Sequence, residues 1–412
     1  MVSRNLFEKA NQVVSILLLN SGSSSLKGTL MNSLDGATLA SGLVDWAGTK
    51  VRYEFSSRNG QKSASDVSCQ SHADAVRLFL ADLKTDRSAE FGENLGLSGV
   101  GHRIVHGGSF TSSIRITSDV QSRIAELSTI APLHNPPSLE TLRVAEEELP
   151  DIPHVAVFDT TFHATLPLSA STYPVPERWT REFGIRRYGF HGLSYAYCSK
   201  RAAEMLNRPL EELRLVICHL GNGCSATAVL QGKSIDTTMG LTPLEGLMMG
   251  TRSGSIDPSI VLEMQLRQGM TAVEVETALN RQSGLLGVSQ VSGDLRLVQA
   301  AADSGNAQAQ LAIEIYTRRI RQAIGSLAVT MGGVDALIFT AGVGEHAGSI
   351  RETVCNGLEC LGLKLDSNRN ATLTPDADLS SSSSSGKILI IHTREDLTMF
   401  REVSRVLEAD HD

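Results

Sequence analysis

The sequence predicts an α/β protein made of two domains of similar design. Short apolar runs that suit strands alternate with helix-like stretches along 412 residues, and hairpins lie between them. A glycine-rich turn occurs twice, in segments 16–27 and 216–229, about two hundred residues apart. A chain of this length is too long for one ordinary core. Together these observations favour a duplicated, three-layer α/β architecture.

The two glycine-rich turns share one pattern. In each, an apolar run ends at a polar residue, Asn20 or His219, and is followed by glycine, small residues and a second extended segment. Glycine lets another group approach the backbone closely, and the N–H groups of such a turn form an anion-binding nest. We therefore expect a duplicated fold that binds one polyphosphate with both halves.

Two other nucleotide-binding motifs fit the turns poorly. The second copy contains Gly-x-Gly-x-x-Ala, but segment 225–235 after it is β-prone and has a turn at Gln231 and Gly232, whereas the dinucleotide fingerprint needs a helix there. The first copy has no Gly-Lys-Ser/Thr, so it is not a Walker loop.

The elements are expected in alternating order on both sides of a boundary near residue 160. The predicted domains are 1–160, to which 396–412 return, and 161–395. The first contains strand 16–20 and its hairpin, an extended segment near 51–56, helix 72–84, strand 97–105, helical residues 118–129, a helix over 139–148 capped by Ser138, and strand 155–158. The second contains strand 213–218, a hairpin to 235, helices 258–267, 271–281 and 305–331, strand 336–340, a turn at 341–344, a helix from about 347, a serine loop at 380–385, strand 388–391 and a helix from about 395.

Composition narrows the classes of partner. The net charge of −8 argues against nucleic acid or an anionic membrane, so anions must be bound by local arginines and helix N-termini. Six cysteines without a C-x-x-C pair are typical of reduced thiols in a cytoplasmic protein. The apolar run 13–19 is better explained as a first strand than as a secretion signal, and no run is long enough to cross a bilayer.

Arginines and carboxylates at strand ends are the candidates for chemistry. Arg103 and Arg252 lie in glycine-flanked loops, where a guanidinium can bind phosphate or carboxylate bidentately; the alternative for each is a surface ion pair. Asp159 ends the buried strand 155–158, which suits a Mg²⁺ ligand or a water-binding group, with a helix cap as the alternative. Glu395 similarly follows strand 388–391.

Six of the eleven histidines also lie in the motif regions. Their spacing matches no zinc motif. His191, between Phe190 and Gly192, is the best functional candidate, whereas His134 and His219 could equally be satisfied residues at strand ends. The glycines of 341–346 would let the backbone approach an adenosine.

In this order the motifs resemble the acetate kinase family, within the superfamily of acetate and sugar kinases, heat-shock chaperones and actin. The resemblance covers about residues 14–405. It rests on Asn-x-Gly-Ser-Ser-Ser-x-Lys at 20–27, Gly-His-Arg-x-Val-His-Gly-Gly at 101–108, Pro-Leu-His-Asn-Pro at 132–136, Val-Phe-Asp-Thr at 157–160, Arg-Tyr-Gly-Phe-His-Gly at 187–192, His-Leu-Gly-Asn-Gly at 219–223, Thr-Pro-Leu-Glu-Gly at 242–246, Gly-Thr-Arg-Ser-Gly at 250–254 and Phe-Thr-Ala-Gly-Val-Gly-Glu at 339–345.

The resemblance implies two ribonuclease H-like domains of the actin-like ATPase fold, with the active site in the cleft between them. It implies reversible, direct in-line transfer of the γ-phosphoryl group of ATP to acetate, with Mg²⁺, in a cytoplasmic homodimer that binds neither nucleic acid nor membrane. The nearest alternative is a propionate or butyrate kinase of the same family. A sugar kinase and a non-enzymatic, ATP-driven binding module are more distant alternatives.

The resemblance also assigns residue roles. Asp159, Arg103, Arg252 and His191 would be catalytic, and His134, Ser23 and Ser25 would support the transition state or the site. Asn20 and Glu395 would bind the metal with Asp159. Arg103, Val105, Leu133, Phe190 and Pro243 would bind the acyl substrate. The nucleotide would contact Lys27, His219, Leu220, Gly221, Asn222, Gly223, Asp294, Leu295, Arg296, Gly342, Val343, Gly344 and Glu345.

Six positions depart from the family pattern. They are Gly28 in place of an aromatic residue, Gln290 in place of glycine, His346 and Arg394 in place of asparagine, and Leu193 and Tyr195 after His191.

Overall fold

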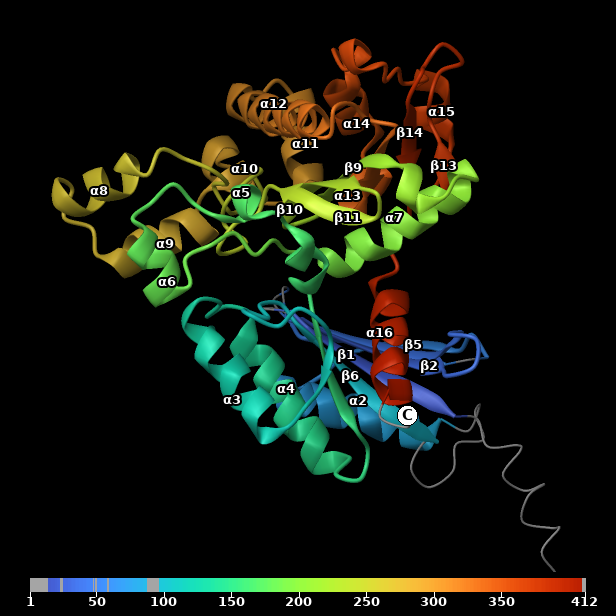
Figure 1. Ribbon diagram of the computed structural model, residues 1–412. Helices are drawn as coiled ribbons and strands as arrows, with labels where there is room; N and C mark the ends of the chain where they lie inside the picture. The colour runs from blue at the N-terminus through green and yellow to red at the C-terminus, as the bar shows by residue number, and fades with distance from the viewer. Residues whose placement is uncertain are drawn as a thin grey trace, which may run out of the picture. The chain divides into compact units, whose positions relative to one another are not determined.

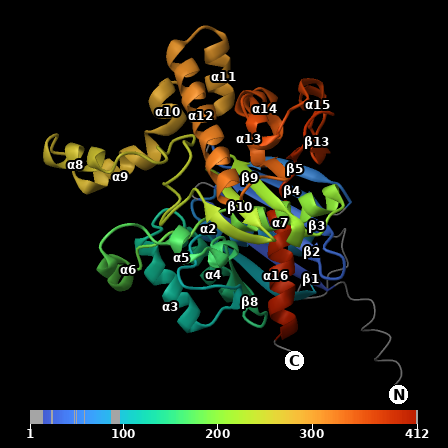
Figure 2. The ribbon, with the colours of Figure 1, turned by 45° about the horizontal axis from the view of Figure 1, so that its top comes forward.

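The computed structural model describes residues 14–22, 25–46, 48, 50–57, 59–86 and 96–409. The chain divides into two compact units, Met1–Thr161 with Arg394–Asp412, and Phe162–Thr393. Figures 1 and 2 show the elements of each unit. Among the described residues, no helix has both the length and the apolar character needed to cross a membrane.

The first unit is built on an eight-stranded sheet of order β5-β4-β3-β2-β1-β6-β8-β7. Strands β1 to β5 pair antiparallel, whereas β6 runs parallel to β1, and β8 runs parallel to β6. The strands are β1 (Ser15–Ser21), β2 (Ser25–Asn32), β3 (Thr38–Asp45), β4 (Arg52–Ser57), β5 (Lys62–Asp66), β6 (Leu97–Ile104), β7 (Ile114–Arg115) and β8 (His154–Phe158). This pairing brings the carboxyl ends of β1, β6 and β8 to one edge.

Helices cover both faces of this sheet. Helices α2 (His72–Thr85) and α4 (Asn135–Glu148) pack on one face, beside α3 (Ser118–Glu126), and α16 (Glu395–Ala409) packs on the other. Two close approaches require glycine. A Cβ on Gly28 would lie 2.1 Å from the Phe79 ring of α2, and one on Gly101 would lie 2.5 Å from Val403 of α16. The Phe79 ring therefore fills the space directly beside Gly28 on β2.

The second unit repeats this plan. Its six-stranded sheet has the order β11-β10-β9-β12-β14-β13, with β9, β10 and β11 antiparallel and β12 and β14 parallel to β9 and β12. The strands are β9 (Arg214–Leu220), β10 (Cys224–Leu230), β11 (Lys233–Thr237), β12 (Ala336–Thr340), β13 (Ala377–Asp378) and β14 (Lys387–Ile390). Since β3-β2-β1-β6-β8 and β11-β10-β9-β12-β14 have the same order and directions, the predicted duplication is confirmed.

Two long helices enclose the second sheet. Helix α7 (Gly192–Leu206) packs on β9 and β12, and α12 (Ala307–Thr330) packs on β9, β10 and β11. The other helices are α5 (Leu168–Ser171), α6 (Glu177–Phe183), α8 (Ser259–Leu266), α9 (Ala272–Arg281), α10 (Gly284–Ser289), α11 (Leu295–Asp303), α13 (Ala341–His346), α14 (Gly348–Cys355) and α15 (Ser367–Thr372). Short 3-10 turns span Leu127–Thr129, Thr161–Thr165, Leu210–Glu212 and Glu359–Leu361.

Two details of the predicted elements are wrong. Ser138 is not a cap, because α4 already begins at Asn135. The first turn of a helix tolerates proline, so the prolines after Asn135 are compatible with this start. Segment 341–344 is not a turn but most of α13. The Glu345 carboxylate accepts a hydrogen bond from the Ala341 N–H at 2.9 Å and so satisfies a donor at the start of that helix.

Candidate active site

In the first unit, Arg103 lies between two carboxylates at the carboxyl edge of the sheet. Its Nε and Nη2 donate to Asp159 Oδ1 and Oδ2 at 2.9 and 2.7 Å, and its Nη1 donates to Glu395 Oε2 at 2.9 Å. Asn20 Oδ1 accepts from Nη1 at 3.4 Å. The strand order thus gathers β1, β6, the residue after β8 and the start of α16 around one guanidinium.

Charge explains why this cluster is tolerated inside the protein. The Asp159 side chain is only 2% exposed, and that of Arg103 14%. Burial by itself lowers the pKa of Arg103, but the adjacent Asp159 and Glu395 outweigh burial and raise that pKa above its ordinary value. Both oxygens of Asp159 accept from Arg103, which favours a charge-pairing role for Asp159 over the helix-cap alternative.

The other described site residues predicted in the first unit lie on β2 and in the loops after β6 and before α4. Lys27 pairs with Asn20 across the hairpin and lines a hollow of about 610 Å³ with residues of β3, β4 and β5. Ser25 begins β2, and its carbonyl accepts from the Gly22 N–H at 2.7 Å; Ser23 lies outside the described residues. His134 is the residue before α4. Val105 and Leu133 are half-buried in loops after β6 and before α4.

In the second unit, the predicted nest is the tight turn of an antiparallel hairpin. Leu220 ends β9 with its side chain buried, and Gly221, Asn222 and Gly223 connect to β10, with the Gly221 N–H donating to the Gly223 carbonyl at 3.0 Å. Strand–turn–strand was the predicted order, and the hairpin confirms it. Cys224 Sγ donates to the Gly221 carbonyl at 3.2 Å and so stabilises the turn.

Two histidines and an arginine border this turn. A Cβ on Gly223 would lie 3.4 Å from His191 Nε2 and 3.6 Å from Arg252 Nη1, and one on Gly221 would lie 3.9 Å from His219 Nε2. The His191 and His219 rings stack with centroids 4.0 Å apart. Three nitrogens therefore converge on the nest, which suits the binding of an anion.

Arg252 is positioned by the loop that carries it. The Gly250 N–H donates to the Asn222 carbonyl at 3.2 Å, which fixes this loop to the nest, and Arg252 Nη1 donates to the Pro243 carbonyl at 3.2 Å. Burial lowers the pKa of Arg252 from its ordinary value. Arg252 is partly buried and donates to a backbone carbonyl, which favours a role at the nest over a surface ion pair, whereas Arg103 does form ion pairs, with carboxylates that are largely buried.

His191 itself is held in an uncommon backbone conformation. Its φ of 59° and ψ of 23° place it in the left-handed region directly before α7. Residues other than glycine adopt this conformation in only a few per cent of cases, with asparagine, aspartate and histidine enriched among them, and such residues cluster at functional sites. The preceding Phe190 is 1% exposed, and its carbonyl accepts from His163 Nε2 at 3.0 Å.

A larger hollow of about 710 Å³ begins at the nest and extends along α11, α13 and α14. Predicted nucleotide residues line it from three separate segments: Gly221, Asn222, Asp294, Leu295, Arg296, Gly342 and Val343. Asp294 and Arg296 form a bidentate ion pair at its rim, which lowers the pKa of Asp294. Sequence reasoning missed Gln299, Ala300, Asp303, Ala347, Ser349 and Ile350, which helix packing brings there, and it noted His346 only as a departure.

Five predicted nucleotide residues of the second unit do not line this hollow: His219, Leu220, Gly223, Gly344 and Glu345. Gly344 lies behind it against β12, where a Cβ would be 3.3 Å from the Phe339 carbonyl carbon. Glu345 is 5% exposed, and its carboxylate accepts from the N–H groups of Ala341 and Thr393 and lies 2.7 Å from His392 Nδ1. It stabilises the start of α13 and the segment that follows β14.

The remaining departures from the family pattern have visible environments. Gln290 ends α10 with φ of 57°, the left-handed position at which glycine is usual. Arg394 forms a bidentate pair with Asp396 at 2.9 and 3.0 Å. Leu193 is buried in the first turn of α7.

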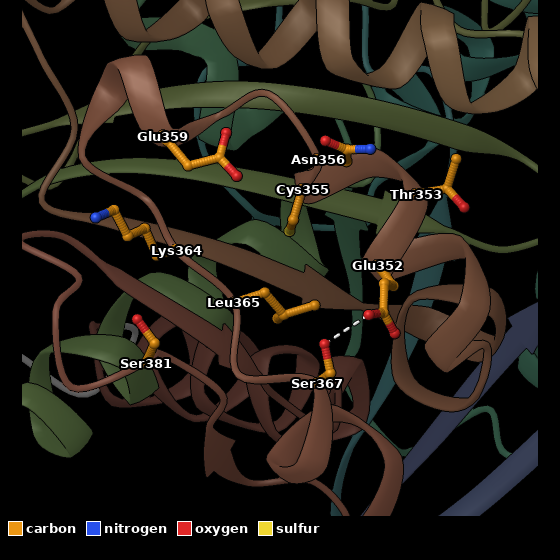
Figure 3. A pocket seen from close by; sticks show the side chains of 9 residues that line it. All are labelled: Glu352, Thr353, Cys355, Asn356, Glu359, Lys364, Leu365, Ser367 and Ser381. Carbon is orange, nitrogen blue, oxygen red and sulfur yellow. Dashed lines mark hydrogen bonds between the residues drawn. The ribbon is translucent and has the colours of Figure 1, made fainter.

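A separate hollow of about 470 Å³ lies between α14 and the segment before α15 (Figure 3). Its lining mixes Glu352, Glu359 and Lys364, and Ser367 donates to Glu352 at 2.6 Å. None of the predicted site residues lines it.

The duplicated sheet, a nest between its first two strands and a nucleotide-sized hollow beside that nest define a phosphotransferase of the actin-like ATPase fold. Comparison with known proteins supports this class. The model of the acetokinase family matches residues 15–401, and the chain belongs to this family.

Close relatives and solved structures agree. The chain is 44% identical to an acetate kinase of Thermoanaerobacterium thermosaccharolyticum over 396 residues, covering 96% of this chain and 99% of that protein. It is 38% identical to the solved acetate kinase of Porphyromonas gingivalis, with a TM-score of 0.87, covering 96% of this chain and all of that one. A solved propionate kinase of Francisella tularensis has the same identity, a TM-score of 0.88, and coverages of 95% and 100%. These matches confirm the predicted fold and a phosphotransferase with a carboxyl group as acceptor.

Proposed function

We propose that the protein transfers the γ-phosphoryl group of ATP reversibly to acetate, giving acetyl phosphate and ADP. The observation that carries this proposal is the convergence of His191, His219 and Arg252 on the glycine nest, next to a nucleotide-sized hollow. The 44% identity to a protein named acetate kinase supports acetate as the acceptor.

The chemistry requires charge stabilisation rather than a base. A carboxylic acid with a pKa of about 4 is already ionised at neutral pH. The barrier is repulsion between this anion and the anionic γ-phosphate, so positioned cations and N–H donors lower it. Arg252, with the N–H groups of the nest, would stabilise the moving phosphoryl group, and Arg103 would bind the acyl phosphate.

Magnesium fits the residues around Arg103. Asp159, Glu395 and Asn20 supply the carboxylate and amide oxygens that Mg²⁺ prefers, and Mg²⁺ commonly uses only one or two protein carboxylates and retains water. We propose that these three side chains hold the ion, directly or through water. When bound, it would neutralise part of the charge of the phosphate oxygens.

The predicted acyl-binding residues are apolar, apart from Arg103. Val105 and Leu133 belong to the first unit, and Phe190 and Pro243 to the second. We propose that Val105 and Leu133 contact the methyl group of acetate. Propionate is the second candidate acceptor, because a similar structure is named a propionate kinase.

Hydroxamate trapping tests the proposed function. Purified protein, Mg-ATP and one acid from formate to butyrate are incubated with hydroxylamine, and acyl hydroxamate is measured, with glucose as a non-carboxyl control acceptor. We expect the highest kcat/KM with acetate and no product when EDTA removes Mg²⁺. ADP formation with the sugar and none with any acid would refute the proposal.

We further propose a cytoplasmic homodimer. None of the six cysteines, all in the described part, forms a disulfide, as expected in a reducing compartment. Helix α8 has no buried residue, and Ile260, Leu262 and Leu266 are 47%, 55% and 80% exposed. Such exposed apolar side chains suit burial against a second copy. Light scattering should give twice the chain mass for the wild type and a lower mass for a Leu262→Glu/Leu266→Glu variant.

A further inference from the structure

Hydroxyl groups lie behind both histidines of the nest. His191 Nδ1 is 2.7 Å from Ser225 Oγ, and Ser225 Oγ forms a very short hydrogen bond with the Tyr195 hydroxyl. His219 Nδ1 is 2.9 Å from Ser194 Oγ, which accepts from Thr393 Oγ1 at 2.9 Å. Each imidazole thus has a serine at Nδ1, and each serine has a second hydroxyl behind it.

Burial gives the first of these chains a direction. Tyr195 and Ser225 are both 0% exposed. Burial also raises the pKa of Tyr195, so its phenol keeps its proton. A buried phenol must donate that proton, and Ser225 Oγ is the acceptor that the structure places against it. Ser225 then has its own proton to donate, and His191 Nδ1 lies within reach to accept it.

We propose that Tyr195 and Ser225 are positioning residues that hold His191 as the neutral tautomer protonated at Nε2. An imidazole that accepts at Nδ1 carries its proton on Nε2. Nε2 is the nitrogen that borders Gly223. His191 therefore presents an N–H donor to the nest without needing a positive charge, and the chain Thr393, Ser194 and His219 provides the same arrangement beside Gly221.

The serines at Nδ1 also orient the His191 and His219 rings. The His191 and His219 rings stack at 18°, with both Nδ1 atoms held by serines of α7 or β10. Fixing both tautomers gives two N–H donors, on rings with nearly parallel planes, beside the two glycines of one turn. Donors that are oriented before the reaction stabilise a developing charge without reorganisation. The inference rests on the proposed phosphoryl transfer only for its effect on rate.

Nitrogen NMR of the full-length protein tests the tautomer without any substrate. Protein labelled with ¹⁵N-histidine is recorded at pH 7, and the His191 signals are assigned from their loss in His191→Asn. We expect a protonated Nε2 and an unprotonated, hydrogen-bonded Nδ1. A proton on Nδ1, alone or together with one on Nε2, would overturn the proposal.

Two variants then remove the chain stepwise. Ser225→Ala should change the Nδ1 shift of His191, allow the other tautomer and lower kcat about 10- to 100-fold, with KM for ATP little changed. Tyr195→Phe removes one hydroxyl without changing the ring, so kcat should fall about 2- to 10-fold, and this variant keeps the test decisive if Ser225→Ala does not fold. Unchanged His191 chemical shifts and unchanged kcat in both variants would refute the positioning role of Tyr195 and Ser225.

Ser234→Ala is the matched control. Ser234 is also a buried serine bonded to a histidine, 2.8 Å from His163 Nδ1, but His163 Nε2 donates to the Phe190 carbonyl, which fixes its tautomer independently. We expect His163 to keep its tautomer and the His191 shifts to stay unchanged. If no acid is phosphorylated but the His191 tautomer responds to Ser225→Ala, the proposed function fails and the positioning chain stands.

Discussion

The two units have one strand order but place their key arginines in different electrostatic surroundings. Arg103 of the first unit is bonded to Asp159 and Glu395, and these carboxylates raise its pKa. Arg252 of the second unit borders the glycine nest and donates to a carbonyl, and burial lowers its pKa. The two units therefore have similar backbones but different side chains. The first unit combines two carboxylates with Arg103, and the second combines Arg252 with the hydrogen-bond donors of the nest.

This difference suggests that the two sets of residues bind different ligands. Carboxylates around Arg103 suit a cation such as Mg²⁺, whereas the histidines and Arg252 around the nest suit phosphate oxygens. It also suggests different responses to mutation, because one arginine compensates buried acids and the other carries a desolvated charge itself.

Arg103→Ala should have the largest effect. It leaves the buried Asp159 carboxylate without its bidentate partner, and removing one member of a buried pair costs about 3–5 kcal/mol. We expect lower stability of the first unit in urea as well as a large loss of kcat. A control is Arg77→Ala, whose ion pairs with Glu147 and Glu148 are half-exposed and should contribute little. Equal urea midpoints for the two variants would contradict the comparison.

Arg252→Ala should damage catalysis more than stability. Loss of one such donor costs about 3 kcal/mol of transition-state stabilisation, roughly a hundredfold or more in kcat, while removal of a desolvated cation spares the fold. Steady-state kinetics and urea unfolding measure the two effects. Arg201→Ala, in a surface pair with Glu204, should keep normal kcat. Near-normal kcat in Arg252→Ala would remove Arg252 from the site.

Acid should destabilise the second unit through His163. Burial lowers its pKa from 6.5 to about 4, so the unfolded chain binds the proton first as the pH falls. Stability should therefore be constant above about pH 6.5 and decrease by about 3 kcal/mol between pH 6.5 and 4. Hydrogen exchange of segment 225–237 measures this loss of stability, and His163→Asn should make the stability less dependent on pH. The same slope in the variant would exclude His163 as the cause.

Asp159→Asn should impair Mg²⁺-dependent turnover more than folding. The variant keeps the side-chain shape and leaves Glu395 paired with Arg103, so we expect a stability loss of about 1–3 kcal/mol. We expect a larger fall in kcat and a shifted Mg²⁺ dependence, measured by titrating Mg²⁺ at fixed ATP. Unchanged Mg²⁺ dependence, or a chain that does not fold, would remove the metal role of Asp159.

Val105→Ala should have the smallest effect. If Val105 limits acyl length, removal of its two methyl groups makes room for a third carbon, and each methylene is worth about 1–3 kcal/mol of discrimination. The ratio of kcat/KM for propionate over acetate should rise, chiefly through KM. A ratio that does not move, or a wild type that already prefers propionate, would leave only a short-chain acyl kinase.

Local patterns predicted most of the fold. The alternation of apolar strands and helical stretches, and the repeated hairpin after Asn20 and His219, anticipated the duplicated sheets. The errors at Ser138 and at 341–344 concern helix starts where the N-cap side chain makes no capping hydrogen bond: His134 precedes α4 and Thr340 precedes α13. The motif residues also identified the family.

The sequence by itself determined which residue types were available: glycines for the nests, arginines and acids at strand ends, and histidines beside them. Only the tertiary structure decided which of them meet. Arg103 and Glu395 are 292 positions apart, and strand order together with the return of α16 brings them to 2.9 Å. The contact of Ser225 with both Tyr195 and His191 likewise depends on how α7 packs on its sheet. Periodicity and spacing describe neighbours along the chain, whereas hydrogen bonds between distant segments form only when the packed sheet sets their distance and direction.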